Sequence, residues 1–229
     1  MKYKLSDIHE IVGDFQRSNK PEDRYASFDY CYNYFKGNSG AFLLENMERS
    51  CMTLGFYLAS WGMLRGSSFL LSKSAKHYQP LVEYIARLDR SVWEIDADNL
   101  RKNIPIVLMI YSEVQKLTIH SKNSHATLVT KIILGVFGFI PAFDLYFCNT
   151  FRKIFGASHG FRSINKKSLE AICDFYDHNR DEIDSVSETI FTMDFASGRY
   201  SIHHYPKAKI IDMYGFNKGL RAAQRGTPS

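Results

Sequence analysis

The stretch Thr130–Phe147 limits what this chain can fold into more than any other part of the sequence. Its centre, Ile132–Phe143, is apolar and uncharged, and Lys131 and Asp144 flank it. Burying this run brings both charged groups to the margin of a dry interior. A charged group in such a position is either paired or used in chemistry, so we expect chemistry first at Lys131 and Asp144.

The spacing of apolar residues predicts helices along most of the chain. One stripe, with residues alternately four and three positions apart, indicates a helix of about five turns. Its members are Leu43, Met47, Cys51, Leu54, Leu58 and Trp61. Gly66 is expected to cap this helix, and Ser67 or Ser68 to start the next short one.

Similar stripes predict further helices, at Leu81–Leu88, Pro105–Val114, Leu169–Tyr176 and Ile183–Met193. The only strand signal is weak and covers Gly198–Tyr205. Because 45% of the 229 residues are hydrophobic, the chain can form one continuous core. We therefore predict a single all-α domain over residues 1–229, with a flexible C-terminal tail at about residues 223–229.

Within the central segment, glycine and proline predict the helix boundaries. Gly138 is expected to end one helix and Pro141 to open the next, which would run to Phe155 and stop at Gly156. Asp144 would then lie in the first turn, where the helix dipole stabilises a carboxylate by roughly 0.3 to 1 kcal/mol. This structural role alone is enough to explain why an aspartate stands at this position, without any catalytic function.

The sequence lacks features of an exported or membrane protein. The segment MKYKLSDIHE has no apolar signal core, and Ile132–Phe143 is too short to span a bilayer. The cysteines Cys31, Cys51, Cys148 and Cys173 lie far apart, which favours free thiols in a reducing cytoplasm. We expect a soluble cytoplasmic protein without membrane contact. The spacing of His and Cys suggests no metal site, and we expect no cofactor.

The charges are segregated, although the net charge is only +5. Bases dominate residues 116–167, acids dominate residues 170–194, and the segment from residue 207 onward is basic again. This pattern fits either a polyanion-binding surface or an internal match between basic and acidic helices. The candidate nucleic-acid contacts in the basic stretch are Arg152, Lys153, Arg162, Lys166 and Lys167.

The features around Asp144 resemble part of a known enzyme family. A helix, a tight glycine turn, a proline and then an aspartate is similar to the active-site region of the helix-hairpin-helix DNA glycosylase superfamily. The matching residues are Phe137, Gly138, Pro141 and Asp144, and the resemblance covers only about residues 130–147. That family's hairpin carries glycines whose amides hold a DNA phosphate, whereas the corresponding stretch here, SKNSHATLVTK, has none.

The resemblance implies roles for several residues. Asp144 would stabilise an oxocarbenium-like sugar and orient the attacking water. Lys131 would either replace the lost phosphate contact or pair with a buried carboxylate. A flipped base needs an aromatic pocket, for which the candidates are Trp61, Phe143 and Tyr146.

Arg65 is a further candidate for binding an anion. It precedes Gly66, Ser67 and Ser68, whose small side chains and backbone amides suit a phosphate or carboxylate. Alternatively, Arg65 satisfies the last carbonyls of its own helix, or forms an ion pair with Asp144.

Two other classes of function stay open. HEPN-type ribonucleases use a closely spaced Arg and His, and this chain offers Arg152 with His159 and Arg199 with His204. A non-catalytic helical module that binds a protein, a nucleic acid or a second copy of itself needs the fewest assumptions. The leading hypothesis is a nucleic-acid-interacting helical protein that is a DNA glycosylase-like hydrolase or its inactive descendant.

Overall fold

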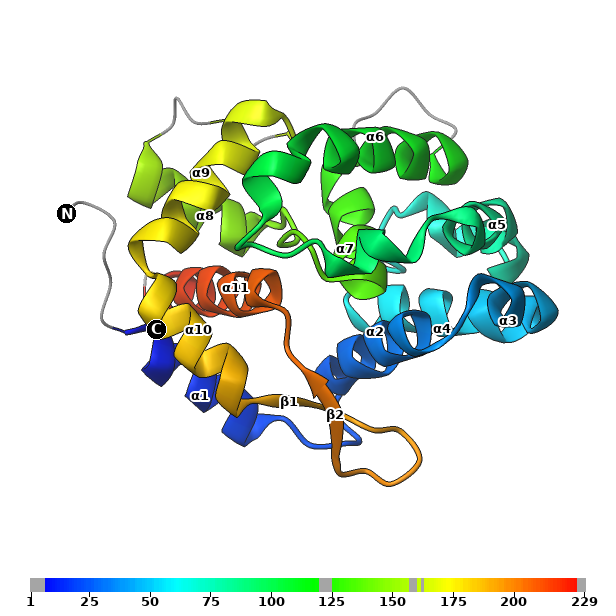
Figure 1. The fold of residues 1–229 in the computed structure, drawn as a ribbon, viewed down its shortest axis with the longest axis horizontal. Helices are drawn as coiled ribbons and strands as arrows, with labels where there is room; N and C mark the ends of the chain where they lie inside the picture. The colour runs from blue at the N-terminus through cyan, green and yellow to red at the C-terminus, as the bar shows by residue number, and fades with distance from the viewer. Residues whose placement is uncertain (1–6, 120–124, 157–159, 162, 226–229) are drawn as a thin grey trace.

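The computed structural model describes residues 7–119, 125–156, 160–161 and 163–225, and this part of the chain is mostly helical (Figure 1). The prediction of an all-α fold is confirmed. The α-helices are α1 (Ile8–Ser18), α2 (Ser27–Gly37), α3 (Gly40–Glu45), α4 (Met47–Ser60), α5 (Gln79–Arg87), α6 (Leu100–Thr118), α7 (Ala126–Phe137), α8 (Leu145–Phe155), α9 (Lys166–His178), α10 (Arg180–Thr189) and α11 (Lys207–Arg225). The shorter elements are the 3-10 turns η1 (Arg24–Ala26), η2 (Phe69–Ser72), η3 (Ala75–Tyr78) and η4 (Arg90–Glu94), and the strands β1 (Phe191–Met193) and β2 (Tyr200–His204).

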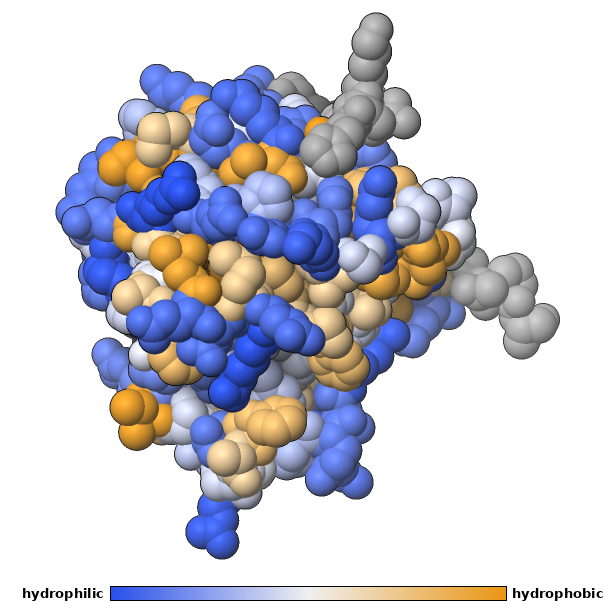
Figure 2. All heavy atoms as spheres, turned by 90° about the vertical axis from the view of Figure 1, so that its right-hand side faces the viewer, coloured by the Kyte–Doolittle hydropathy of each residue, from blue (hydrophilic) through white to orange (hydrophobic). Residues whose placement is uncertain are grey.

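Helix α7 lies at the centre of the fold, between two groups of helices (Figure 1). It packs against α2, α4 and α6, whereas α11 packs against α1, α8 and α10. The loop between α7 and α8 connects the α7 group with the α11 group. In this loop, the Ala142 amide donates to Asp212 on α11 over 3.0 Å. On the side of α3 and α5, the surface shows apolar residues bordered by hydrophilic ones (Figure 2).

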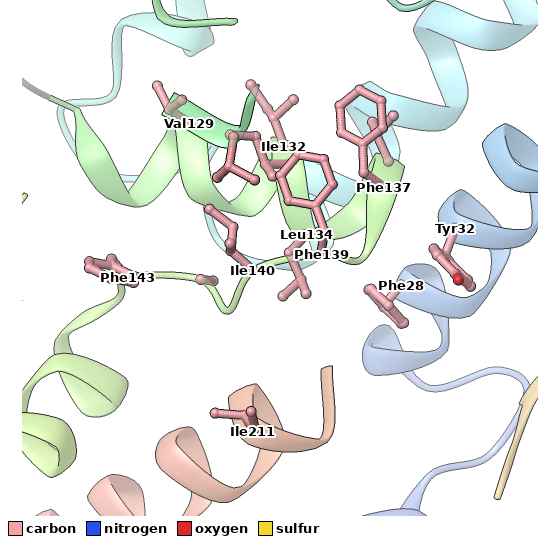
Figure 3. Close-up of a cluster of buried hydrophobic side chains, with 14 of the residues drawn as sticks. Phe28, Tyr32, Val129, Ile132, Leu134, Phe137, Phe139, Ile140, Phe143 and Ile211 are labelled. Carbon is pink, nitrogen blue, oxygen red and sulfur yellow. The ribbon is translucent and has the colours of Figure 1, made fainter. Parts of the chain in front are cut away.

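Helix α7 has no solvent-facing side. Every residue from Leu128 to Phe137 is buried, as expected for a helix that is apolar all round apart from Thr130 and Lys131. Its side chains, together with those of the following loop, lie near the rings of α2 and near Ile211 of α11 (Figure 3). Gly135 allows α4 to approach closely, because a Cβ there would collide with the Tyr57 ring.

The long helix expected over Leu43–Trp61 is divided into two. Asn46 has φ −108° and ψ 41°, so it leaves helical geometry between α3 and α4. Its side-chain amide donates to the Phe42 carbonyl over 3.0 Å, which satisfies an acceptor at the end of α3. The apolar spacing continues across this break and therefore did not reveal it.

Helix α4 ends at Ser60 and is capped by Gly62, not by Gly66 as predicted. Gly62 has φ 75°, and the Met63 amide donates to the Leu58 carbonyl over 2.8 Å. This is the hydrogen-bond pattern of a Schellman motif, in which glycine takes the left-handed position. The chain turns back at Gly62, which places Trp61 at the C-terminal end of α4.

Three other boundary predictions are confirmed. Gly138 ends α7 with φ 77°, and Gly156 follows the last residue of α8 with φ 89°. Ser68 starts η2, since its side-chain oxygen accepts a hydrogen bond from the Leu70 amide. At these positions the conformational preference of glycine and the capping ability of serine were sufficient to predict the helix boundary.

The two prolines expected to open helices do not do so. Helix α6 begins at Leu100 and contains Pro105 in its interior, because buried apolar residues continue the stripe toward the N-terminus. Pro141 belongs to the loop, and α8 begins only at Leu145. Asp144 is therefore the N-cap residue of α8 rather than a residue of its first turn.

A β-hairpin follows α10, where the sequence predicted helix as far as Met193. Strand β1 pairs antiparallel with β2, which confirms the strand signal in Gly198–Tyr205. Two side chains of α2 hold the hairpin: Asp29 accepts from the Met193 amide over 2.9 Å, and Asn33 donates to the Met193 carbonyl over 2.9 Å. These partners lie far away in the chain, so the local pattern did not reveal β1.

The four cysteines are free and buried, which confirms the prediction of free thiols. Burial raises the pKa of Cys148 to about 12 and that of Cys173 to about 11. These two thiols are therefore weak nucleophiles at neutral pH. Among the helices that the structure describes, none combines the length and apolar character needed to cross a bilayer.

Candidate functional site

Lys131 extends from α7 into the contact with α4. Only 5% of its surface is exposed, and its Nζ donates to the Trp61 carbonyl over 2.7 Å. That carbonyl belongs to the C-terminal end of α4, where the helix dipole favours a cation. Burial lowers the pKa of Lys131, while the charges of Asp144 and Asp212 act in the opposite direction. This buried amine cannot touch a phosphate in the described conformation, so the contact offered by the resemblance is not formed here.

Asp144 lies at the N-terminal end of α8 and is only partly buried. Its Oδ1 accepts a hydrogen bond from the Phe147 amide over 2.9 Å, which satisfies one of the free amides of the helix end. Burial raises the pKa of Asp144 and so does the charge of Asp212, whereas the Phe147 amide and Lys131 lower it. The carboxyl is thus electrostatically coupled to charges of both signs.

Lys209 and Asp212 complete this arrangement, and the sequence analysis predicted neither of them. They lie one turn apart on α11, both buried, with Nζ and Oδ2 2.7 Å apart. The other Asp212 oxygen is the acceptor of the Ala142 amide, so the pair also fixes the loop before α8. We call Lys131, Asp144, Lys209 and Asp212 the buried charge cluster. Its formal charges cancel when all four groups are ionised.

Trp61, predicted for the base pocket, lies against both amines of the cluster. The Nζ atoms of Lys209 and Lys131 are 4.2 and 5.5 Å from the centre of its ring, within reach of cation–π attraction. The rings of Tyr25 and Phe216 meet it edge-on, with centroids 5.3 and 6.5 Å away. The indole is only 6% exposed. It therefore separates the amines from solvent.

The other two residues predicted for the base pocket lie apart from each other. Phe143 is buried and packs against Phe147 with ring centroids 5.5 Å apart. Tyr146 is partly exposed and meets Phe216 edge-on, with centroids 5.3 Å apart. Because Phe216 also contacts Trp61, Tyr146 and Trp61 share an aromatic neighbour. Phe143 belongs to the core instead.

Arg65 is exposed near the same end of α4 as Trp61 and Lys131. Its Nε lies 3.2 Å from where a Cβ of Gly62 would be, so the guanidinium folds back over the capping glycine. Its charge contributes to the lowered pKa of Lys131. Lys131 therefore feels the charges of both Arg65 and Asp144.

The remaining residues predicted to bind nucleic acid are Arg152, Lys153, Arg162, Lys166 and Lys167. The Arg152 guanidinium donates to the Phe161 carbonyl over 2.9 Å. Lys153 and Lys167 are exposed, and Lys166 lies 3.8 Å from Glu170 in an exposed pair. Arg162 lies outside the described residues. Arg152 and Lys153 belong to α8, and Lys166 and Lys167 to the start of α9, whereas Arg65 follows α4.

Much of the charge segregation is matched internally. Arg101 on α6 contacts both Asp174 and Asp177 of the acidic block, at 2.8 and 2.9 Å. Lys207 contacts Asp184 at 3.1 Å, and two further bases of α11 pair with acids of α1. Internal matching thus applies to the acidic block and the basic C-terminal segment. The bases of α8 and α9 remain the candidates for a polyanion-binding surface.

One Arg–His pair of the ribonuclease hypothesis is separated in the structure. Arg199 immediately precedes β2, whereas His204 is its last residue and lies opposite Phe191 of β1. The His204 ring packs on the Phe191 ring, with centroids 4.0 Å apart. His159, the partner of Arg152 in the other pair, lies outside the described residues.

Two pockets help to place these residues. One of about 380 Å³ lies between α8 and α11, and Tyr146, Lys153 and Lys218 are among its lining residues. Another, of about 670 Å³, lies between α2, α4 and the hairpin, and no predicted site residue lines it. Within the buried charge cluster, Lys131, Lys209 and Asp212 are buried, whereas Asp144 is partly exposed. Comparisons with protein-family models, with curated proteins and with solved structures found no match to this chain.

Proposed function

We propose that this protein acts on nucleic acid and hydrolyses an N-glycosidic bond, with Asp144 as the catalytic carboxylate. The supporting observation is the position of Asp144 at the solvent-facing margin of the buried charge cluster. It immediately precedes Leu145 and Tyr146, which line the pocket between α8 and α11. A carboxylate in a partly dry place is suited to stabilising positive charge that develops on a sugar.

The reaction follows from this placement. The bond between C1′ and the base breaks, and its electron pair leaves with the base. A water molecule bonds to C1′ and gives one proton to Asp144, and the base gains a proton through solvent. Asp144 must be ionised to do this: burial and the Asp212 charge raise its pKa, and the Phe147 amide and the Lys131 charge offset part of this effect. Lys131 thus acts on Asp144 through its charge.

The surroundings of Asp144 offer contacts for a nucleic-acid strand. Tyr146 is a partly exposed ring on which a base can stack. Lys153 lines the same pocket, and Lys166 and Lys167 are exposed at the start of α9. Exposed ammonium groups of this kind contact phosphates without sequence preference.

The test is Asp144→Asn, assayed for base release from oligonucleotides that contain uracil, alkylated or oxidised bases. Asparagine is also a good N-cap residue, so this variant keeps the helix end. We expect activity to fall about 100-fold or more, as when a group that stabilises transition-state charge is lost. The matched control is Asp89→Asn, which changes another N-cap carboxylate, at η4. Wild-type activity in folded Asp144→Asn would refute the proposal.

A non-catalytic binding module is the second candidate. It is favoured by the paired and buried state of Lys131, Lys209 and Asp212, which is how structural charges are usually kept. In this case Asp144 serves only as a helix cap. Nucleic-acid affinity would then fall by orders of magnitude between low and moderate salt, yet Asp144→Asn would not change it.

A further inference from the structure

The pocket beside the hairpin has the size of a small-molecule site. Its volume of about 670 Å³ lies within the range usual for such sites. Rings of three different segments line it: Tyr30 and Tyr34 from α2, Phe56 from α4 and Phe195 from the hairpin. Phe56 is 69% and Phe195 78% exposed. Large apolar side chains left exposed around a hollow usually mark a binding surface.

Two of these rings form a corner. The ring planes of Tyr30 and Phe195 are 86° apart, with centroids separated by 5.1 Å. Each ring has a fixed support. The Tyr30 hydroxyl donates to the Pro21 carbonyl over 2.7 Å, and Asp29 and Asn33 hold the hairpin that carries Phe195. Little conformational freedom is therefore lost when a ligand enters this corner.

The corner carries negative charge. Glu22 and Asp194 line the pocket, and both contribute, after burial and Asp29, to raising the pKa of Tyr30. Hydrogen bonds from Ser197 lower the pKa of Asp194, so that carboxylate stays ionised at neutral pH. A ligand at the Tyr30 ring therefore enters a negative field.

The arginines that line the pocket are engaged with other rings. The Arg24 guanidinium lies 4.6 Å from the centre of the Tyr25 ring, and that of Arg49 lies 5.4 Å from the centre of the Tyr34 ring. Neither is among the groups that perturb Tyr30. Both guanidinium groups thus already contact rings other than those of the corner.

We propose that the corner formed by Tyr30 and Phe195 binds an alkylated ammonium group, either in a free small molecule or on a peptide side chain. The aromatic faces attract a cation, and the carboxylates of Glu22 and Asp194 supply the opposite charge. An apolar coat of alkyl groups suits the ring-lined wall, and such a cation loses less hydration than a bare ammonium. This site is separate from Asp144 and does not depend on the function proposed for it.

The test compares choline with 3,3-dimethylbutan-1-ol, a neutral molecule of nearly the same shape, by calorimetry and ligand-observed NMR. We expect choline to bind about 5- to 30-fold more tightly, which is the range of a cation–π contact. Equal binding of the two molecules, or no binding of choline at millimolar concentration, would overturn the proposal. A trimethyllysine amide is titrated in parallel. Tighter binding of choline indicates a free small molecule as the ligand, and tighter binding of the trimethyllysine amide indicates a peptide side chain. Either result supports the binding of an alkylated ammonium group.

Variants locate the binding to the corner. Phe195→Leu keeps an apolar side chain on the hairpin but removes the ring, and should weaken choline binding about 5-fold or more. Tyr200→Leu is the matched control, because Tyr200 is a similarly exposed ring on strand β2 of the same hairpin and does not line the pocket. It should leave choline affinity unchanged. An unchanged affinity in Phe195→Leu, or an equal loss in both variants, contradicts the assignment.

Discussion

The buried charge cluster and the pocket beside the hairpin differ in how their charges are satisfied. In the cluster, Lys209 is 1% exposed and its Nζ meets Asp212 and two aromatic rings. In the pocket, rings and carboxylates surround open volume. The interior charges thus hold helices together, whereas those of the pocket can meet a ligand. Asp144 is the cluster member that is only partly buried, which is why the proposed chemistry is assigned to it.

Removing Lys209 should have the largest effect on stability. Lys209→Met leaves Asp212 buried without its cation, which costs about 3–5 kcal/mol in the free energy of unfolding. Urea unfolding followed by circular dichroism measures this change. The double variant Lys209→Met/Asp212→Asn should recover much of the loss, because asparagine still accepts from the Ala142 amide. A loss below about 1 kcal/mol in the single variant would show that the interior tolerates an unpaired charge.

Asp29, which holds the hairpin beside the pocket, should make the stability of the protein depend on pH. Burial raises its pKa to about 7, so the folded chain keeps a proton that the unfolded chain loses near pH 4. Stability from this group is complete below pH 4 and is lost as pH rises to about 7, by up to about 4 kcal/mol. Asp29→Asn removes this dependence.

The measurement is the difference in unfolding free energy between Asp29→Asn and wild type at several pH values. This difference should move in favour of the variant from about pH 4 to pH 7 and then level off. Asp96, whose pKa burial raises to about 6, titrates in both proteins and cancels. If the unfolding free energies of Asp29→Asn and wild type changed with pH in parallel, Asp29 would not be the titrating group.

Two substitutions of Asp144 distinguish its role as a helix cap from its proposed role in catalysis. Asp144→Ala should destabilise the protein by about 1 kcal/mol because it removes the acceptor of the Phe147 amide. Asp144→Asn should change stability by only a few tenths of a kcal/mol, while the proposed base-release activity should fall about 100-fold or more. Thermal unfolding of both variants, measured beside the activity assay, checks this. Equal stability of the alanine variant and wild type would mean that the cap contributes nothing.

Lys166 provides the smallest expected effect. Its pair with Glu170 is exposed, so Lys166→Met should change the free energy of unfolding by less than about 0.5 kcal/mol. If the start of α9 contacts phosphates, the same variant should weaken nucleic-acid binding and reduce its salt dependence. Titrations at two salt concentrations measure both. An unchanged salt dependence would exclude Lys166 from the interface.

The fold class could be predicted because helical periodicity is a local property. Gly138 and Gly156 marked helix ends for the same reason, since each supplies a left-handed or otherwise unusual backbone that its neighbours cannot adopt easily. The break at Asn46 and the strand β1 could not be predicted in this way. The first depends on one side-chain hydrogen bond, and the second on Asp29 and Asn33 far away in the chain.

The candidate site was predicted in part for a similar reason. Lys131 and Asp144 were recognisable because a long apolar run separates them. Lys209 and Asp212 flank only two isoleucines, and their spacing is that of an ordinary surface ion pair on a helix. Parts of the chain far from α11 cover them: the rings of Phe28 and Trp61 contact Lys209, and the Ala142 amide donates to Asp212. Burial on all sides is a property of the assembled fold and leaves no short-range pattern.

The four buried thiols belong to four different helices, since Cys31 lies in α2, Cys51 in α4, Cys148 in α8 and Cys173 in α9. An alkylating reagent reaches each of them only when its own helix separates from the rest. The order in which they are modified in rising denaturant, followed by peptide mass spectrometry, therefore reports which parts of the molecule open first. The native protein carries its own set of unfolding probes.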